Sequence, residues 1–403
     1  MKIDARAAGF SEKRLTRINE HLTKNYIDNG RIHGCQVLVA RHGYPALFES
    51  YGLKDAERGQ AMAADTIFRI YSMTKPITSI ALMQLYERGL FQLNDPVHRV
   101  IPQWRDQRVY LSGEGQSLKT ESARAPMTFR HVLSHCAGLT YGSSAHPVDQ
   151  EYQEVGVRRS DGETLDSFVE KLAQVPLRYQ PGEQWLYSLA TDVCGYLVET
   201  LSGLPFDEYL QKFIFGPLGM TDTAFHVAPE KLDRFAANYQ RRKDKTLKLI
   251  DDPLDSSYQH KPDFFSGGGG LTGTTGDYYR FCEMLRGGGQ LDGVRVIGSR
   301  TLQLMTQNHL KGGRDLTQMA IGSFSETAYE GVGFGLGFAM TLGRVESGQV
   351  ASGDYYWGGA ASTIFWVDPH EDLVVVFMTQ LMPSATFNFR GQLKNIIYGA
   401  IED

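Results

Sequence analysis

The chain has 403 residues, of which 42% are hydrophobic and 22% charged, as is usual for a soluble globular protein with a sizeable core. A formal net charge of −5 gives no reason to expect nucleic acid or an anionic membrane as a partner. The first residues lack an apolar stretch and no segment is long enough to span a bilayer, so we expect a cytoplasmic protein. The length allows two or three domains, or one large domain with an insertion.

Metal-binding and disulfide patterns are absent from the sequence. The four cysteines lack C-x-x-C spacing, which favours free buried thiols over disulfides or zinc ligands. They are Cys35, Cys136, Cys194 and Cys282. His131 and His135 have helical i, i+4 spacing, but H-V-L-S-H lacks the glutamate of a zincin and no third ligand is evident. We predict no metal and no cofactor.

Helix and strand patterns follow each other in a clear order along the chain. The first part is predicted to form a helix, two strands joined by a turn at Gly43, and a second helix. These elements cover residues 11–28, 36–40, 46–51 and 72–89. The polar stretch 107–126 is predicted as a loop. A mainly helical region then extends to about residue 261. Its helices are expected at residues 128–135, 165–174, 189–201 and 206–215.

The C-terminal part of the chain is rich in strand patterns again. Strands are predicted at residues 333–342, 355–357, 362–367 and 373–379, with a closing amphipathic helix at 387–401. The charged run 240–252 is most simply a solvated hairpin or loop. The glycine-rich stretch 266–277 lacks the lysine of a phosphate-binding loop. We interpret it as backbone turns and a helix N-cap rather than as a ligand site.

The order of β-rich, helical and again β-rich segments predicts an α/β (α+β) fold, an antiparallel sheet flanked by helices with an inserted helical domain. Residues 1–90 and 266–403 are expected to form the sheet-containing domain from both ends of the chain. Residues 91–265 would be the inserted, mainly helical domain. The active site is expected in the cleft between the two domains.

Ser72 and Lys75 form the one place in the chain where a lysine follows a serine by three positions. They begin an apolar helical run that ends at Gly89, and residues three apart share a helix face, so Lys75 can reach the Ser72 hydroxyl. A lysine kept neutral by burial and a neighbouring cation can take the serine's proton, which activates the serine without histidine. The alternative is a helix first turn with a serine cap and a solvent-exposed lysine.

Two further segments carry candidate residues. Tyr187 precedes a helix, so its phenol can project into a cleft and relay protons beside an ammonium; the alternative is a core tyrosine. In Trp357-Gly358-Gly359-Ala360, the glycines would let a backbone N–H approach an oxyanion. The alternative there is a β-bulge beside a core aromatic residue. No G-x-S-x-G is present, so the nucleophile elbow of an α/β-hydrolase is unsupported.

Taken in order, S-M-T-K, Y-S-L and W-G-G resemble the motifs of the serine β-lactamase and penicillin-binding-protein superfamily. The chain most resembles the family VIII carboxylesterases, which share the class C β-lactamase fold. H-V-L-S-H-C-A-G-L-T-Y and S-G-G-G-G-L also resemble connecting segments of that family. The resemblance extends over residues 32–379 and implies a β-lactamase-like fold.

The resemblance implies a role for each matching residue. Ser72 would be the nucleophile and Lys75 its general base, while Tyr187 would share the base role and protonate the leaving group. The backbone N–H groups of Ser72 and Ala360 would form the oxyanion hole. Tyr141, in G-L-T-Y-G, would line the acyl pocket.

The positions expected to bind substrate, besides Tyr141, are Leu189, Trp357, Gly358 and Gly359, and the first two depart from the β-lactamase pattern in ways that matter for substrate. Leu189 replaces the asparagine of Tyr-x-Asn, and Trp357 replaces the lysine of Lys-Thr-Gly. The chain thereby loses an amide and a cation, and both losses favour a neutral, apolar ester over an anionic β-lactam. No deacylating glutamate is identifiable, so Lys75 and Tyr187 would also have to activate water.

We therefore expect a serine carboxylesterase that hydrolyses small neutral esters through an acyl-enzyme on Ser72, with weak β-lactam hydrolysis as a side activity. One alternative is an acyltransferase of the same fold that passes the acyl group to an alcohol. A β-lactamase or D,D-peptidase and an inactive binding protein are further alternatives. The expected partner is a small-molecule ester, and the sequence indicates no particular oligomeric state.

Overall fold

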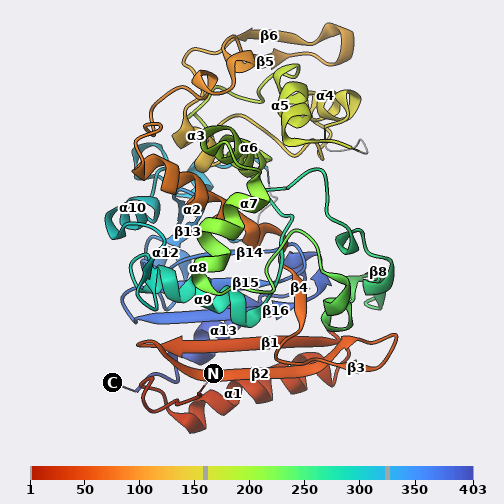
Figure 1. Ribbon diagram of the computed structural model, residues 1–403, viewed down its shortest axis with the longest axis vertical. Helices are drawn as coiled ribbons and strands as arrows, with labels where there is room; N and C mark the ends of the chain where they lie inside the picture. The colour runs from red at the N-terminus through yellow and green to blue at the C-terminus, as the bar shows by residue number, and fades with distance from the viewer. Residues whose placement is uncertain (1, 158–161, 323–326, 403) are drawn as a thin grey trace.

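An antiparallel sheet joins the two ends of the chain in this computed structural model, which describes residues 2–157, 162–322 and 327–402 (Figure 1). Among these residues, eight strands lie in the order β12-β13-β14-β15-β16-β1-β2-β3. β1 near the N-terminus pairs with β16 near the C-terminus, with Val37 opposite Phe377. The strands are β1 (Gly34–Arg41), β2 (Tyr44–Asp55), β3 (Gln60–Ala61), β12 (Val332–Phe334), β13 (Ala339–Thr341), β14 (Tyr355–Gly358), β15 (Ile364–Asp368) and β16 (Leu373–Thr379).

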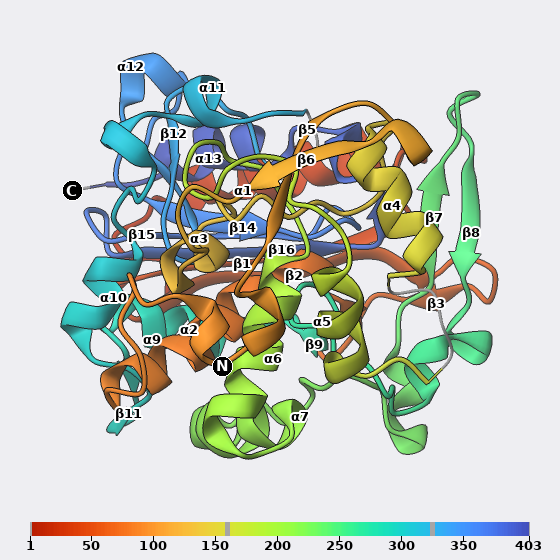
Figure 2. The ribbon, with the colours of Figure 1, turned by 90° about the horizontal axis from the view of Figure 1, so that it is seen from above.

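Helices cover both faces of this sheet (Figure 2). α1 (Glu12–Leu22) and α13 (Phe389–Tyr398) pack together on one face, and α9 (Thr275–Arg286) packs against β1, β15 and β16 on the other. Every residue of β1 and of β16 is therefore buried. A strand covered on both faces has no solvent side to alternate with, which explains the unbroken apolar run L-V-V-V-F-M in β16.

A mainly helical part lies above the sheet in Figure 1. It contains α3 (Phe129–Leu133), α4 (Pro147–Val155), α5 (Leu165–Ala173), α6 (Ala190–Ser202), α7 (Phe206–Leu210), a π-helical turn (Gln211–Phe215) and α8 (Gly216–Leu218). α2 (Thr74–Glu87) packs against α6 and is buried on all sides from Thr74 to Leu85. The helices predicted in this region are thus confirmed, and α2 enters the interior as a fully covered helix.

Short elements connect the sheet and the helical part. β4 (Ile67–Arg69) pairs with β9 (Thr272–Thr274), and β7 (Asn238–Arg241) pairs with both β8 (Leu247–Asp251) and β17 (Leu381–Met382). The charged run 240–252 therefore forms a hairpin, as predicted. That hairpin lies in the predicted insertion 91–265, yet its strand β7 pairs with β17 near the C-terminus. The division into two domains stays a prediction.

Several predicted elements differ from the structure. The stretch 107–126, predicted as a loop, contains the hairpin of β5 (Arg108–Ser112) and β6 (Lys119–Ser122). In β5 the apolar residues Val109, Tyr110 and Leu111 follow one another without alternation, and β6 is polar throughout. The single strand predicted at 333–342 is a hairpin of β12 and β13, and Gly337 turns the chain there with φ of +92°. Ser11 lies at the N-cap of α1 but its side chain makes no capping hydrogen bond.

Further short elements lie between α9 and β14. They are β10 (Gln290–Leu291), β11 (Val294–Arg295), α10 (Ser299–Met305), α11 (Leu316–Met319) and α12 (Arg344–Ser347). No helix in the described ranges has both the length and the apolar character needed to cross a membrane.

A buried ion pair fastens α13 to the sheet. Lys394 of α13 donates to Asp354 at 2.5 Å, and the two side chains are 1% and 0% exposed. Burial lowers the pKa of Lys394, and the Asp354 carboxylate opposes that shift. Removing one member of such a pair leaves an uncompensated buried charge.

Asp354→Asn is therefore expected to lower the free energy of unfolding by about 3–5 kcal/mol, measured by urea denaturation. Glu12→Gln is the control, because Glu12 pairs with Arg6 at 3.5 Å on the exposed surface. Exposed pairs contribute about 0–1 kcal/mol. Equal losses in the two variants would contradict a structural role for the buried pair.

Candidate active site

Ser72 lies in a tight turn at the entrance to α2. The chain leaves β4, passes through a 3-10 turn over Tyr71–Met73 and continues as α2 from Thr74. Tyr71, directly before Ser72, has φ of +42°, a left-handed conformation that costs energy for a residue with a Cβ. Ser72 is 8% exposed. The turn thus presents the serine at the start of a buried helix.

Lys75 is buried and surrounded by oxygen atoms. Its Nζ lies 3.3 Å from Ser72 Oγ, 2.9 Å from the Tyr141 hydroxyl and 2.7 Å from the Gly268 carbonyl oxygen. The same nitrogen lies 4.5 Å from the centre of the Tyr187 ring. The side chain is not in solvent, because the residue is 1% exposed. The structure therefore contradicts the alternative of an exposed lysine and brings together the four side chains predicted around the nucleophile.

Gly268 reaches Lys75 because a buried carboxylate holds its loop. Asp192 of α6 is 0% exposed, and its Oδ1 accepts hydrogen bonds from Ser266 Oγ at 2.5 Å and from the Gly268 N–H at 3.1 Å. A Cβ at position 268 would lie 2.6 Å from Asp192 Oδ2, so the close approach needs glycine. Sequence reasoning predicted turns for this stretch and missed Asp192. Thr274 does cap α9, as predicted.

Trp357 lies beneath Tyr187. Its Nε1–H donates to the Tyr187 hydroxyl at 3.1 Å, the two ring centres are 5.2 Å apart, and the indole is 0% exposed. The His135 ring lies 5.0 Å from the Tyr187 ring on another side. Burial holds the pKa of His135 well below its usual value, so this imidazole is neutral. Tyr187 is thus fixed among aromatic side chains.

The turn after β14 offers a backbone donor beside Ser72. Gly359 donates its N–H to the Thr363 carbonyl at 2.7 Å, and a Cβ there would lie 2.4 Å from the Ile70 carbonyl oxygen. The turn therefore packs directly against the segment that leads to Ser72. Within the described residues, the Ala360 N–H donates to no acceptor. The Ser72 N–H is in the first turn of its helix, where no intrahelical acceptor exists. Both groups can bind an oxyanion.

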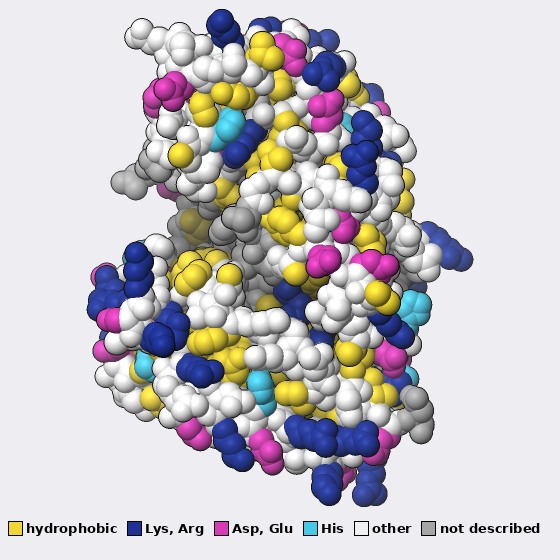
Figure 3. Space-filling view, turned by 180° about the vertical axis from the view of Figure 1, so that it is seen from behind, with side chains coloured by type: hydrophobic (Ala, Val, Ile, Leu, Met, Phe, Trp, Pro, Cys, Tyr) yellow, Lys and Arg dark blue, Asp and Glu magenta, His cyan; other side chains and the backbone are white. Residues whose placement is uncertain are grey.

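A cavity of about 580 Å³ opens in front of Ser72, and we call it the active-site cavity. Its lining is aromatic, hydroxylic or backbone: Tyr71, Ser72, Tyr141, Ser143, Phe225, Ser257, Tyr258, His260, Pro262, Phe264, Ser266, Gly268, Gly269, Gly270 and Ala360. The space-filling view shows the molecule hollowed at mid-height on one side, between the helical part and the sheet (Figure 3). The described lining contains no Lys, Arg, Asp or Glu.

Some of the residues predicted to contact substrate line the active-site cavity, and others do not. Tyr141 lines the active-site cavity, as do Ser72 and Ala360. Leu189, Trp357, Gly358 and Gly359 do not belong to the described lining. Leu189 is 1% exposed at the start of α6, and Gly358 packs against Arg390. A motif position in the sequence does not determine which way a side chain points.

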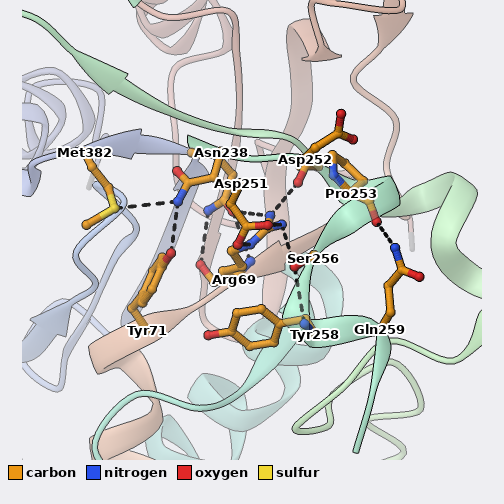
Figure 4. A network of polar contacts seen from close by, with 12 residues as sticks. Arg69, Tyr71, Asn238, Asp251, Asp252, Pro253, Ser256, Tyr258, Gln259 and Met382 are labelled. Atoms are coloured by element: carbon orange, nitrogen blue, oxygen red, sulfur yellow. Dashed lines mark hydrogen bonds and ion pairs between the residues drawn. The ribbon is translucent and has the colours of Figure 1, made fainter. Parts of the chain in front are cut away.

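Arg69, three residues before Ser72, binds one wall of the cavity to the nucleophile turn (Figure 4). The residue is 0% exposed, and Nε and Nη2 donate to the two carboxylate oxygens of Asp251 at 2.6 and 2.7 Å. Nη2 also donates to Ser256 Oγ at 3.2 Å, which accepts the Tyr258 N–H as well. Bidentate pairs of this kind fix geometry as well as charge. Tyr258 is thereby held where it lines the cavity.

The histidines and cysteines outside this site show no metal-binding arrangement. Burial and the neighbouring Arg130 lower the pKa of His131 to about 4. The described ranges contain no group of three His, Cys, Asp or Glu side chains placed to hold a metal ion. The four cysteines are buried and unpaired with one another.

Trp357→Phe tests what the indole contributes. The variant keeps an aromatic ring but removes the donor to the Tyr187 hydroxyl, and a hydrogen bond between neutral groups contributes about 0.5–1.5 kcal/mol. We expect kcat for a short ester to fall about two- to tenfold, while KM stays nearly constant. Trp104→Phe is the control, because it loses an indole hydrogen bond to the Val169 carbonyl. A changed KM with unchanged kcat would instead indicate direct substrate contact.

Asp251→Asn tests the wall held by Arg69. The substitution leaves the buried guanidinium without its carboxylate and loosens the segment that carries Tyr258. Because that segment lines the cavity without touching Lys75, KM is expected to rise severalfold with kcat changed by less than about threefold. Asp244→Asn, at the tip of the same hairpin, is the control. An unchanged KM in Asp251→Asn would contradict the role of this ion pair.

Comparison with known proteins agrees with this fold and site. The model of the family described as Beta-lactamase matches residues 19–396. Esterase EstB of Burkholderia gladioli is 30% identical over 370 residues, which cover 87% of this chain and 86% of that protein. The monacolin J acid methylbutanoyltransferase of Aspergillus terreus is 28% identical over 336 residues, 80% and 78% of the two chains.

A solved structure described as EstCE1, a hydrolase with promiscuous acyltransferase activity, superposes with a TM-score of 0.79. It is 27% identical, and the match covers 96% of this chain and 99% of that one. The predicted β-lactamase-like fold and the resemblance to esterases of that superfamily are confirmed. With nearly its whole length matched by the family model, the chain belongs to the beta-lactamase family.

Proposed function

We propose that the protein is a serine carboxylesterase that hydrolyses small neutral esters through an acyl-enzyme on Ser72. The observation that carries the proposal is the Ser72–Lys75 pair at 3.3 Å, opening onto a cavity whose described lining has no Lys, Arg, Asp or Glu. A cavity whose described lining offers no Lys or Arg side chain to an anion favours an uncharged ester over an anionic β-lactam. The cavity is lined both by Ser72 and Ala360 and by Tyr141 and Phe225, which supports a site between the two predicted domains.

In the proposed mechanism Lys75 acts as a neutral amine. Such an amine has two N–H donors and one lone pair. The donors suit the Gly268 carbonyl and the Tyr141 hydroxyl, which leaves the lone pair for the Ser72 hydroxyl proton. Ser72 Oγ then attacks the ester carbonyl carbon. The N–H groups of Ser72 and Ala360 stabilise the negative oxygen of the tetrahedral intermediate.

The second half of the reaction releases the alcohol and then the acid. The proton taken from Ser72 passes to the departing alkoxide, with Tyr187 next to Lys75 as the phenol that relays it. Water then enters, gives a proton to the same groups and attacks the acyl carbon, which restores Ser72 and releases the carboxylic acid. Trp357 supports the Tyr187 oxygen through its indole N–H.

An acyltransferase activity is the second candidate. It requires the same acyl-enzyme and differs in the acceptor, which is an alcohol in place of water. The methylbutanoyltransferase of Aspergillus terreus and the promiscuous acyltransferase activity named for EstCE1 support this candidate. The ratio of transferred to hydrolysed acyl groups in the presence of butanol separates the two.

Lys75→Arg is expected to lower kcat for p-nitrophenyl butyrate by about 10²–10⁴-fold, the usual contribution of a general base, because a guanidinium keeps its proton at working pH. Ser72→Ala is expected to abolish turnover. Ser143→Ala is the matched control, since Ser143 lines the same cavity without bonding Lys75. Thermal melting checks that each variant is folded. Near wild-type kcat in folded Lys75→Arg would exclude Lys75 as the base.

A further inference from the structure

A second cavity of about 430 Å³ lies directly beside the active-site cavity, and we call it the side cavity. It is lined by Leu204, Asp207, Glu208, Gln211, Lys212, Phe215, Thr223, Ala224, Phe225, His226 and Phe265. Phe225 is the residue that lines both cavities. The two cavities therefore meet at Phe225.

The Phe225 ring is held firmly in this position. It is 4% exposed, and its centre lies 5.7 Å from the Phe206 ring and 5.1 Å from the Phe265 ring. A Cβ at Gly270 would lie 2.8 Å from Phe225 Cδ1, so the ring packs on the glycine-rich wall of the active-site cavity. The backbone before it is fixed as well, because Ala224 exchanges two hydrogen bonds with Thr272.

The chain from His260 to Phe265 completes the division. His260, Pro262 and Phe264 line the active-site cavity, whereas Phe265 lines the side cavity. Lys261 points the other way from its neighbours and pairs at 2.6 Å with Asp207, a residue of the side cavity. This segment therefore contributes residues to both cavities.

We propose that Phe225 is a specificity-determining residue, which ends the substrate cavity and excludes long apolar chains of the ester from the side cavity. The inference rests on the proposed esterase function and adds to it the size class of the substrate. Leu204, Phe215, Ala224 and Phe265 contribute apolar surface to the side cavity, whose lining also includes charged residues such as Asp207, Glu208 and Lys212. An alkyl chain of the ester enters that lining when the Phe225 ring is removed.

The experiment compares kcat/KM for p-nitrophenyl butyrate and octanoate, and for butyl and octyl butyrate, in the wild type and in Phe225→Ala. Each methylene group that becomes buried is expected to raise kcat/KM about fourfold. In Phe225→Ala, the ratio of kcat/KM for the eight-carbon ester to kcat/KM for the four-carbon ester is expected to rise at least about tenfold, in the acyl series or in the alcohol series. Phe213→Ala is the control, because Phe213 lies in the same region and lines neither cavity. Unchanged ratios in both series would overturn the proposal.

Two additions keep the result interpretable. Phe225→Leu fills more of the space, so it preserves the fold if Phe225→Ala is unstable, and it is expected to raise the ratio in the same direction by a smaller factor. Binding of butyl and octyl p-nitrophenyl ethers to Ser72→Ala, with and without Phe225→Ala, requires no catalysis. A wild type inactive on every ester would refute the proposed function alone. If Phe225→Ala does not strengthen binding of the octyl ether relative to the butyl ether in the Ser72→Ala background, the role of Phe225 is refuted.

Discussion

The burial of Lys75 is the constraint on which the rest of this structure depends. An amine taken out of water is costly unless its hydrogen-bonding groups are satisfied. Here three oxygens, from Ser72, Tyr141 and Gly268, lie within 3.3 Å of its Nζ, and the Tyr187 ring covers it. Burial disfavours the charged form of a lysine. A buried charged Lys75 would destabilise the fold, whereas a buried neutral Lys75 can accept a proton from Ser72.

Holding these oxygens together requires segments that are far apart in the chain. β4 delivers Ser72 from the N-terminal part, and β14 places Ala360 beside it from the C-terminal part. Asp192 fixes the loop that carries the Gly268 carbonyl. Arg69 joins the segment before Ser72 to the β7–β8 hairpin and to Ser256, which accepts the N–H of the cavity residue Tyr258. The pairing of β1 with β16 makes these contacts possible by bringing the two ends of the chain into one sheet.

Spacing patterns in the sequence predict those contacts of the site that are made between residues close together in the chain. The i, i+3 spacing of Ser72 and Lys75 predicts their contact because both stand on one helical turn. The Gly268 carbonyl comes from 193 residues further along the chain, and no spacing rule brings it there. Trp357 was recognisable from its motif, yet its buried orientation under Tyr187 depends on packing between β14 and the helical part. The β5–β6 hairpin escaped prediction because β5 does not alternate polar and apolar residues and β6 is polar throughout.

The central claim is that Ser72 carries an acyl group during turnover, and mass spectrometry of the trapped intermediate tests it most directly. The protein is mixed with p-nitrophenyl butyrate, quenched in acid within milliseconds, digested and mapped. The account predicts one butyryl group on the peptide that contains Ser72, and its loss on longer incubation before the quench. A butyryl group on any other residue, or a burst of p-nitrophenol without an adduct on Ser72, would contradict it.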